Sequence, residues 1–321
     1  MADNCRICGS TFDDITYDVK EMYFGTRDVF EYRRCSACTC LQIGSIPADI
    51  GNYYPEHYYS LHIKKQHRHG RMQSTLREMK LNAALGGDKL MSAMLFFLRK
   101  PRLPPWVDFL QLTSTHRILD VGCGAGKLLL KLDKKGFRCL EGVDPFIDAP
   151  IAYPCGVKIY KEQLWDIARD SDKFKCFDLV MMHHSLEHIP DQHRTFTAAA
   201  DLLKAQGRLL VRVPLSSSWA WQHYREHWVQ LDAPRHLYLH SASSLEQLAH
   251  QHGFTLDSVH FDSTAFQFTG SEKYLRDIAL VDKTDSDCFS TQQLSQFKQQ
   301  AETLNREGNG DQACFVFKLV A

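Results

Sequence analysis

The sequence predicts an α/β protein with a mostly parallel sheet, preceded by a small cysteine-rich module. Apolar runs of strand length, the first at Ile118 to Val121, alternate with helical patterns such as the one that starts at Lys127. This order is typical of parallel sheets. A glycine-rich turn follows the first of these runs, and two Cys-x-x-Cys pairs lie within the first 40 residues. Such pairs are typical of small metal-stabilised modules.

The glycine-rich turn predicts a nucleotide-like ligand. The run before it ends around an acid, Asp120, and Gly122, Gly124 and Gly126 follow at alternate positions, with Cys123 between the first two. Glycines allow a ligand to approach the backbone closely, and the free amides at the start of the following helix attract anions. This combination suits a ligand that carries adenosine and a carboxylate.

A second acid, Asp144, closes the next predicted strand, which begins at Leu140. Its carboxylate can accept hydrogen bonds from both hydroxyls of a ribose. The dinucleotide fingerprint requires Gly-x-Gly-x-x-Gly, whereas this chain has Gly-x-Gly-x-Gly with Lys127 at the next position. Two alternatives to the site for an adenosine-containing ligand with a carboxylate remain: an NAD-binding domain, and a turn that no longer binds a ligand.

Another strand is predicted at 177–184, directly before Ser185-Leu186-Glu187-His188. For Glu187 and His188, a structural pair that holds the following loop is favoured over direct catalysis. Further strands are expected at 207–214, 254–261 and 314–320, and helices near 72–99, 196–204, 241–253 and 291–307. Serine caps and a terminal glycine mark the helix at 241–253, and prolines at 101, 104 and 105 mark a boundary.

The cysteine pairs predict a structural zinc site. Cys5 with Cys8 and Cys35 with Cys38 supply four thiolates, the tetrahedral set that structural zinc prefers, and four protein ligands leave no open position. Strand-like alternation at 29–34 fits a zinc ribbon, and metal binding replaces the core that so short a module lacks. Cys40 could replace Cys38 as the fourth ligand. The alternatives to a zinc site are free cysteines or a redox pair.

Composition narrows the class of protein. At 321 residues with 44% apolar content, the chain is long enough for a large domain and a small one. The 38 basic and 38 acidic residues cancel, which argues against a broad nucleic-acid-binding surface. The polar start shows no signal peptide, and the longest apolar run, at 90–98, is too short to span a bilayer. Eleven cysteines without an export signal predict a reducing, cytoplasmic setting.

The segment Trp219 to His240 is rich in aromatic, histidine and charged side chains. It follows the predicted strand at 207–214, whose carboxyl end lies on the ligand side of an open α/β sheet. We therefore expect it to form the acceptor side of an active site. The first candidates for a catalytic base are His236 and His184, and Arg235 is the candidate for steering an anionic acceptor.

His227 and Asp232 are the next candidates. For each of these residues taken alone, a structural hydrogen bond is the alternative, and Arg235 can pair with Asp232 as a brace. No histidine spacing in the sequence indicates a catalytic metal site.

These features together resemble one family. The turn reads Asp-Val-Gly-Cys-Gly-x-Gly, tyrosine pairs stand at 53–54 and 58–59, and a Trp-x-x-x-Asp-x-Pro-Arg-His segment ends at His236. The chain resembles the bacterial class I S-adenosylmethionine-dependent methyltransferases that carry an N-terminal zinc ribbon. The resemblance covers most of the chain and implies a Rossmann-like core with a seven-stranded, mostly parallel sheet.

The resemblance also implies a domain plan and a cofactor site. The plan is a zinc ribbon at 1–46, an aromatic connector and helical segment at 47–102, and a methyltransferase domain at 103–321 with capping insertions at 215–242 and 264–312. The implied cofactor is S-adenosylmethionine, in addition to the structural zinc. The residues expected to contact S-adenosylmethionine are Asp120, Gly122, Cys123, Gly124, Gly126, Asp144 and His184.

Methyl transfer is implied, but the acceptor is open. Relatives often sit among genes for polysaccharide, sugar or secondary-metabolite synthesis, which favours a small or carrier-linked acceptor such as a sugar nucleotide or polysaccharide precursor. An RNA methyltransferase whose ribbon contacts RNA is one alternative, but acidic side chains outnumber basic ones over 1–46. A non-catalytic cofactor-binding protein is the other. The basic run at 63–71 is either solvated surface or a contact for a phosphate-bearing substrate.

Overall fold

The computed structural model describes residues 4–54, 77–79, 81 and 103–320. The chain divides into two compact units. The first comprises Met1–Pro55, His184–Phe196 and Val211–Phe317, and the second comprises Glu56–His183, Thr197–Leu210 and Lys318–Ala321. Most of the helix expected over 72–99, the tyrosine pair at 58–59 and the basic run at 63–71 lie outside the described residues.

The second unit is built on short parallel strands. Strand β4 (Ile118–Val121) pairs in parallel with both β5 (Leu140–Val143) and β8 (Phe177–His183), and β7 (Lys158–Tyr160) pairs in parallel with β5. All four residues of β4 are buried, as expected for strands covered on both faces. The α/β class with a mostly parallel sheet is confirmed.

The sheet contains one strand more than expected. Its hydrogen-bonded order is β11-β12-β9-β8-β4-β5-β7-β6, which is eight strands. The additional strand is β6 (Ile151–Ala152), which pairs antiparallel with β7. Only two residues long, β6 is joined to β7 by a turn in which Gly156 has a φ of 101°. A strand this short has no alternating pattern that the sequence could reveal.

Helix α4 (Lys127–Lys135) starts directly after the glycine-rich turn. Its N-cap is Gly126, and its C-cap is Gly136 with a φ of 117°, a conformation that only glycine adopts readily. Leu129, Leu130 and Leu132 form its buried face. The other helices at or near this unit are α3 (Pro105–Phe109), α5 (Leu164–Ile167) and α6 (Gln192–Leu202), the last of which spans both units.

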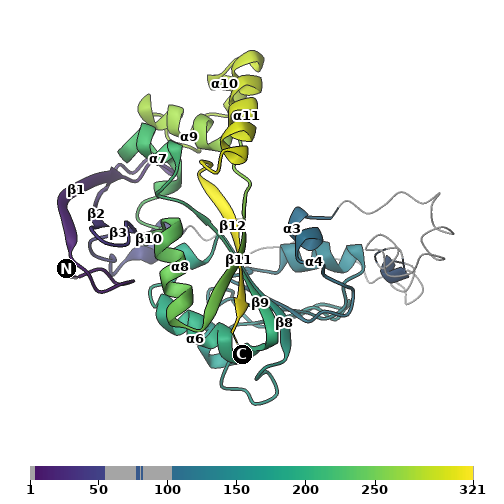
Figure 1. The fold of residues 1–321 in the computed structure, drawn as a ribbon. Helices are drawn as coiled ribbons and strands as arrows, with labels where there is room; N and C mark the ends of the chain where they lie inside the picture. Colours follow the sequence, from purple (N-terminus) through teal and green to yellow (C-terminus); the bar gives the residue numbers. More distant parts are fainter. Residues whose placement is uncertain (1–3, 55–76, 80, 82–102, 321) are drawn as a thin grey trace. The chain divides into compact units, whose positions relative to one another are not determined.

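The first unit contains a four-stranded antiparallel sheet in the order β1-β2-β3-β10. Strands β1 (Phe12–Lys20), β2 (Val29–Cys35) and β3 (Leu41–Ile43) lie within the residues 1–46 for which the ribbon is predicted. The fourth strand, β10 (Tyr238–Leu239), comes from the segment that follows β9 and pairs with β3 (Figure 1). The ribbon therefore completes its sheet with residues almost two hundred positions further along the chain.

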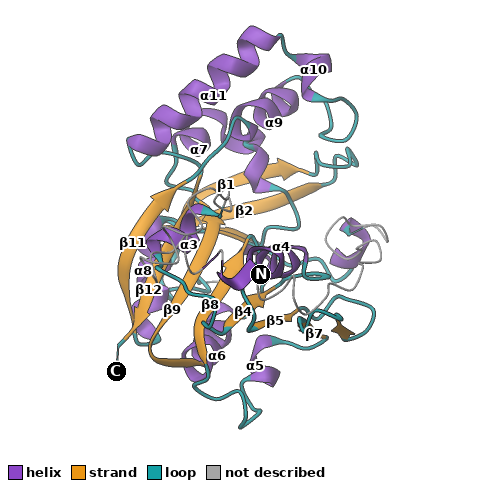
Figure 2. Ribbon diagram, turned by 90° about the vertical axis from the view of Figure 1, so that its right-hand side faces the viewer, coloured by secondary structure: helices purple, strands orange, loops and turns teal. Residues whose placement is uncertain are grey.

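The rest of the first unit follows the predicted element order closely. Helix α8 (Ala242–Gln251) has a capping box made by Ser241 and Ser244, and helices α7, α9, α10 and α11 lie together at one end of the unit (Figure 2). The remaining elements are β9 (Leu203–Pro214), α7 (Trp219–Tyr224), β11 (Phe254–Phe261), α9 (Phe266–Leu275), α10 (Asp285–Cys288), α11 (Thr291–Arg306) and β12 (Gln312–Leu319), with 3-10 turns η1 (Ile50–Tyr53), η2 (Leu186–His188), η3 (Arg225–His227) and η4 (Val229–Leu231). In the described part of the chain, no helix has the length and apolar character needed to cross a bilayer.

Candidate functional site

The predicted glycine-rich turn has the backbone that only glycines adopt easily. Gly122, Gly124 and Gly126 have φ values of 71°, 54° and 79°, all in the left-handed region. A Cβ added at Gly126 would lie 2.8 Å from Cδ1 of Ile159, and one at Gly142 would overlap Sγ of Cys123. Small residues thus let the turn pack tightly against the strands beside it, with Cys123 filling the space over Gly142.

The carboxylate of Asp144 holds this turn in place. Its Oδ2 accepts a hydrogen bond of 2.7 Å from the N–H of Gly124, and its Oδ1 accepts one of 2.9 Å from the N–H of Phe146. Asp144 is buried, and burial raises the pKa of its carboxyl although the two N–H groups oppose this. A carboxylate offers about four lone-pair sites, so two remain for the hydroxyls of a ribose.

Asp120 lies at the start of the turn and is also buried. Burial, together with the charge of Asp144, raises the pKa of its carboxyl to about 8. A cationic ligand group beside Asp120 would reverse this shift, because an opposite charge favours the ionised form. The methionyl ammonium of S-adenosylmethionine is such a group.

Phe146 is a residue of this site that the sequence analysis did not single out. Its side chain is 76% exposed although it is a large apolar group, and its N–H is fixed by Asp144. An exposed aromatic ring beside an acid that is predicted to bind ribose could offer an apolar face to a flat purine ring. Its position two residues after the acid that closes β5 was the available signal.

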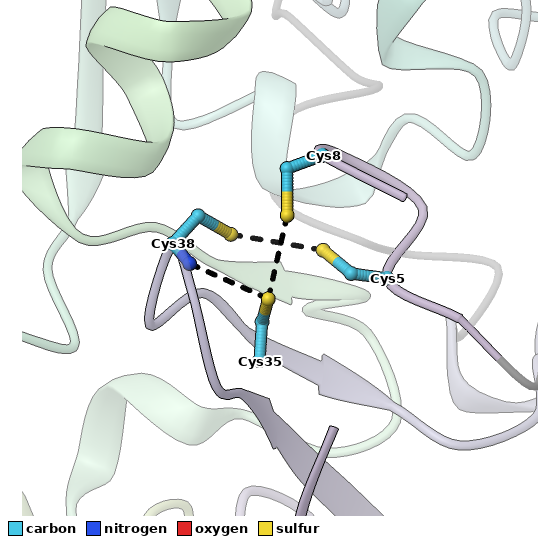
Figure 3. Close-up of side chains that lie close together, drawn as sticks. All are labelled: Cys5, Cys8, Cys35 and Cys38. Atoms are coloured by element: carbon cyan, nitrogen blue, oxygen red, sulfur yellow. Dashed lines mark hydrogen bonds between the residues drawn. The ribbon is translucent and has the colours of Figure 1, made fainter. Parts of the chain in front are cut away.

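In the first unit, the four predicted cysteine ligands come together. Their sulfurs all lie within 4.8 Å of one another and point towards a common centre (Figure 3). Cys5 Sγ is 3.6 Å from Cys38 Sγ, and Cys8 Sγ is 3.4 Å from Cys35 Sγ. Four sulfurs bound tetrahedrally at ~2.3 Å from zinc would be about 3.8 Å apart. The separations therefore fit a zinc ion with modest adjustment.

Neighbouring polar groups support the same assignment. The amide of Gln42 donates to Cys5 Sγ at 2.8 Å, and the N–H groups of Ile7 and Cys38 point at Sγ of Cys5 and Cys35, each at 3.4 Å. Such bonds stabilise the thiolate form that binds a metal. Cys40 is buried, but its thiol faces the carbonyl of Leu41 and it is not part of the cluster.

Both ring nitrogens of His184 contact charged side chains. Its Nδ1 lies 3.3 Å from Oε1 of Glu187, and its Nε2 contacts Nη1 of Arg212, whose Nε donates to Asp262. A carboxylate only accepts and a guanidinium only donates, so the neutral ring with its proton on Nδ1 satisfies both. The lone pair of Nε2 then receives the Arg212 donor. His184 also has a φ of 51°, an uncommon conformation for a residue with a side chain.

Glu187, His188 and His236 gather beside it. His236 Nε2 lies 4.0 Å from Glu187 Oε1 and 3.8 Å from Asp232 Oδ2. Burial favours a raised pKa for Glu187, but its bond to His184 and the nearby imidazoles outweigh it and lower the pKa to about 2. Burial and His236 lower the pKa of His188 to about 4. At neutral pH the group therefore combines a carboxylate with a neutral His188 ring.

Arg235 is enclosed by anions and aromatic rings. Its side chain is 1% exposed, and Nη2 donates to Glu21 at 2.9 Å and to Asp232 at 2.6 Å. The guanidinium also lies over the rings of Tyr23 and Phe24, about 5 Å from each centroid. Since these donors are already engaged, the geometry matches the brace alternative, and the steering of an acceptor stays a prediction.

The aromatic residues of the segment 219–240 divide between core and surface. Trp221 and Trp228 are buried, and the Nε1 of Trp228 donates to Asp311 at 3.2 Å. Tyr32 of the ribbon donates from its hydroxyl to the carbonyl of His236 at 2.7 Å. His227, a secondary candidate for the base, is exposed. Much of the segment therefore packs within the first unit and fixes the position of His236.

The chain was compared with known proteins. A family model described as a methyltransferase domain matches residues 89–259, just over half of the chain. Ubiquinone biosynthesis O-methyltransferase of Marinobacter nauticus is 33% identical over 103 residues, 30% of this chain and 42% of that protein. The protein of the same name from Stutzerimonas stutzeri is 27% identical over 110 residues, 32% of this chain and 47% of its own length. The chain thus spans less than half the length of these two curated relatives.

Among solved structures, a SAM-dependent methyltransferase from Archaeoglobus fulgidus aligns with 76% of this chain and 98% of its own, at 19% identity and a TM-score of 0.42. A geranyl diphosphate methyltransferase in complex with SAM aligns with 74% of this chain and 95% of its own, at 15% identity and a TM-score of 0.45. The family match covers the predicted strand, turn and helix at 118–135 and the acid at 144. The chain therefore belongs to the methyltransferase domain family, within the class I S-adenosylmethionine-dependent methyltransferases.

Proposed function

We propose that this chain transfers the methyl group of S-adenosylmethionine to a hydroxyl of a small or carrier-linked acceptor, such as a sugar nucleotide or polysaccharide precursor. The observation that carries the proposal is the bond between Gly124 and Asp144, which shapes a turn with ribose-binding capacity beside a helix N-terminus. The name O-methyltransferase borne by the partial curated relatives supports a hydroxyl acceptor.

In this proposal, the second unit holds the cofactor. Asp144 receives the ribose hydroxyls, Asp120 faces the methionyl ammonium, and Phe146 covers the adenine. The glycines and Cys123 keep the turn narrow, so that the cofactor lies against backbone N–H groups. His184, the other predicted contact, directly follows β8 but belongs to the first unit, so its contact with the cofactor stays a prediction. Strand β8 itself ends beside β4, at the carboxyl edge of the parallel strands. Parallel strands of α/β proteins present ligands at this edge.

The proposed acceptor chemistry is simple displacement. The sulfonium is already activated, so alignment of the acceptor oxygen with the methyl group accounts for much of the rate. A base that removes the hydroxyl proton adds roughly 10²–10⁴-fold. His236 fits this role better than His184, because its Nδ1 lies 2.7 Å from the carbonyl of Gln230, which fixes the proton there and leaves Nε2 basic. The carboxylates of Glu187 and Asp232 would stabilise the imidazolium formed.

We also propose that Cys5, Cys8, Cys35 and Cys38 hold a structural zinc ion. The sulfur separations and the N–H groups directed at Cys5 and Cys35 support it. The ion would join the turn before β1 to the end of β2, and β2 in turn positions Tyr32 against His236. The zinc ion would stabilise the ribbon, and the ribbon supplies Tyr32, which contacts His236.

Transfer of label from methyl-labelled S-adenosylmethionine tests the proposal. The screen should compare sugar nucleotides, lipid-linked sugars, small hydroxylated aromatics and bulk RNA as acceptors. We expect incorporation into one of the small or carrier-linked classes, abolished by Asp144→Asn and retained by Asp172→Asn, which changes an exposed acid of the same unit. Label in RNA alone would overturn the proposed acceptor class, and equal labelling by both variants would overturn the cofactor site.

A further inference from the structure

In the first unit, three side chains of types that bind metal ions lie close together. One potential ligand atom from each of Glu187, His188 and His236 lies within 4.8 Å of the other two. We infer that these three residues bind a divalent transition-metal ion, at a site other than the four-cysteine cluster. Binding of the ion itself does not depend on the identity of the methyl acceptor.

The hydrogen bonds of both imidazoles leave the same nitrogen available. Nδ1 of His188 lies 2.9 Å from the carbonyl oxygen of Arg235, and Nδ1 of His236 lies 2.7 Å from that of Gln230. A carbonyl only accepts, so each Nδ1 carries the proton and each Nε2 keeps its lone pair. Metal-binding histidines have this arrangement, in which a carbonyl partner fixes the tautomer and turns the free nitrogen towards the ion.

Glu187 completes the ligand set with an oxygen that has no other role in the described part of the chain. The residue has no exposed surface, and its Oε1 faces His184. Its Oε2 is buried without a hydrogen-bond partner. Buried polar atoms without partners are rare in folded proteins, and a bound ion would give this oxygen a partner. The residue that carries this unpartnered oxygen therefore lies in the same cluster as the two imidazoles.

The charges around the cluster also favour a cation. Glu187, Glu21 and Asp232 are carboxylates with little or no exposure, and Arg235 is the guanidinium paired with the last two. Among these four groups, three carboxylates face a single guanidinium, so negative charge exceeds positive charge. Buried uncompensated charge is costly. A divalent cation would offset this excess of negative charge.

Ligand type and number indicate the class of ion. Two imidazoles and one carboxylate suit zinc, iron, manganese or cobalt rather than calcium or magnesium, which prefer oxygen ligands. Bonds of ~2.0–2.2 Å would require the ligand atoms to move closer by about 1 Å. Three protein ligands leave open positions, and Asp232 lies 3.8 Å from the Nε2 of His236 as a further carboxylate. His188 is the least buried of the three and gives the ion access.

A bound ion would change how the acceptor is activated. The lone pair of His236 Nε2 can serve either as a base or as a metal ligand. If it were a ligand, the ion would lower the pKa of a hydroxyl bound at an open position, so that the proton could pass to solvent water instead of to the histidine.

Metal titration of the full-length protein tests the inference. The protein is dialysed against a mild chelator, and Co²⁺ is then added while the visible spectrum is recorded. We expect one ion in the four-thiolate site, recognised by its sulfur-to-metal charge-transfer band, and a second ion without that band. Glu187→Gln and His188→Gln should weaken the second ion at least tenfold, and His227→Gln, a change at an exposed histidine of the same unit, should not. Zinc content by mass spectrometry should fall from two ions per chain to one in the two ligand variants.

Binding of only the thiolate-bound ion by the wild-type protein would overturn the inference. So would undiminished binding of the second ion in both ligand variants. Because the wild-type stoichiometry alone decides the first outcome, a variant that fails to fold leaves the test intact. Circular dichroism and S-adenosylhomocysteine affinity identify such a variant, and His236→Gln then replaces it. The outcome is also separate from that of the label-transfer experiment, which reports on the acceptor.

Discussion

The N–H of Gly124 donates a 2.7 Å hydrogen bond to Oδ2 of Asp144, the acid that follows β5. The turn after one parallel strand is thus held by the end of its neighbour, because β4 and β5 are paired in register, with Val121 opposite Val143. The conformation of the turn is therefore held by the protein's own hydrogen bond. A preorganised site avoids the cost of ordering the turn when the ligand binds.

Gly124→Ala should weaken binding of S-adenosylhomocysteine at least tenfold. The residue has a φ of 54°, so a side chain introduces strain and also projects where the ligand passes. Gly156→Ala is the matched control, because its φ is 101° and a Cβ there would meet nothing within 4 Å. Both variants lose some stability, but only Gly124→Ala should lose affinity in calorimetry. Equal affinities in the two variants would show that the turn does not contact the ligand.

The raised pKa of Asp120 predicts proton release when the cofactor binds. With its pKa at about 8, the carboxyl of the free protein is mostly protonated at pH 7. The methionyl ammonium would lower that pKa, so binding at pH 7 should release up to one proton, and affinity should rise as pH approaches 8 and then level off. Calorimetry in two buffers of different ionisation enthalpy measures the release. Asp120→Asn should release no proton; unchanged release in that variant would contradict this role.

The buried triad of Arg235, Asp232 and Glu21 should be a large contributor to stability. Arg235→Met keeps the volume but leaves two buried carboxylates unpaired, which costs about 3–5 kcal/mol. Arg276→Met is the control, since its pair with Glu272 is partly exposed and worth about 0–1 kcal/mol. Urea unfolding gives both values. If Arg235→Met instead unfolds like the control but loses turnover at least tenfold, the residue acts on the acceptor, as the steering hypothesis requires.

Zinc removal should disturb more than the ribbon. Cys35→Ser removes one sulfur of the cluster and should abolish tight zinc binding, and the ribbon should lose its structure because so short a module has little core. Strand β10 pairs with β3, and Tyr32 bonds the carbonyl of His236, so the same variant should lower turnover. Cys139→Ser, at an exposed cysteine outside the cluster, is the control. A zinc-free variant with a native ribbon by hydrogen exchange would contradict the structural role.

The conformation of the glycine-rich turn could be predicted from the sequence because its causes are local. Alternate glycines at 122, 124 and 126 require a tight backbone, and the acids at 120 and 144 close two buried strands. The clustering of the sulfurs within each Cys-x-x-Cys pair could be predicted for the same reason, since a turn of four residues brings its two sulfurs together.

Contacts between distant segments could not be predicted in this way. The pairing of Tyr238 with Gln42 joins residues 196 positions apart, and nothing in either segment specifies the other. His236 meets Glu187 and His188 only after the chain has passed through α6, β9, α7 and two 3-10 turns. Histidine spacing therefore gave no sign of this cluster. Phe146 was missed because the sequence does not show that its ring is exposed. The exposure of the ring, which makes it a candidate for ligand contact, results from the fold.

We expect the second unit to bind S-adenosylmethionine through Asp144, and isothermal calorimetry with S-adenosylhomocysteine is the sharpest test of this binding. The loss of charge-assisted bonds to a ribose costs roughly 1.5–3 kcal/mol each, so Asp144→Asn should bind at least tenfold more weakly than wild type and than Asp172→Asn. NAD should not compete with the ligand. Equal affinity for S-adenosylhomocysteine in wild type and Asp144→Asn, or tighter binding of NAD by the wild-type protein, would contradict the account.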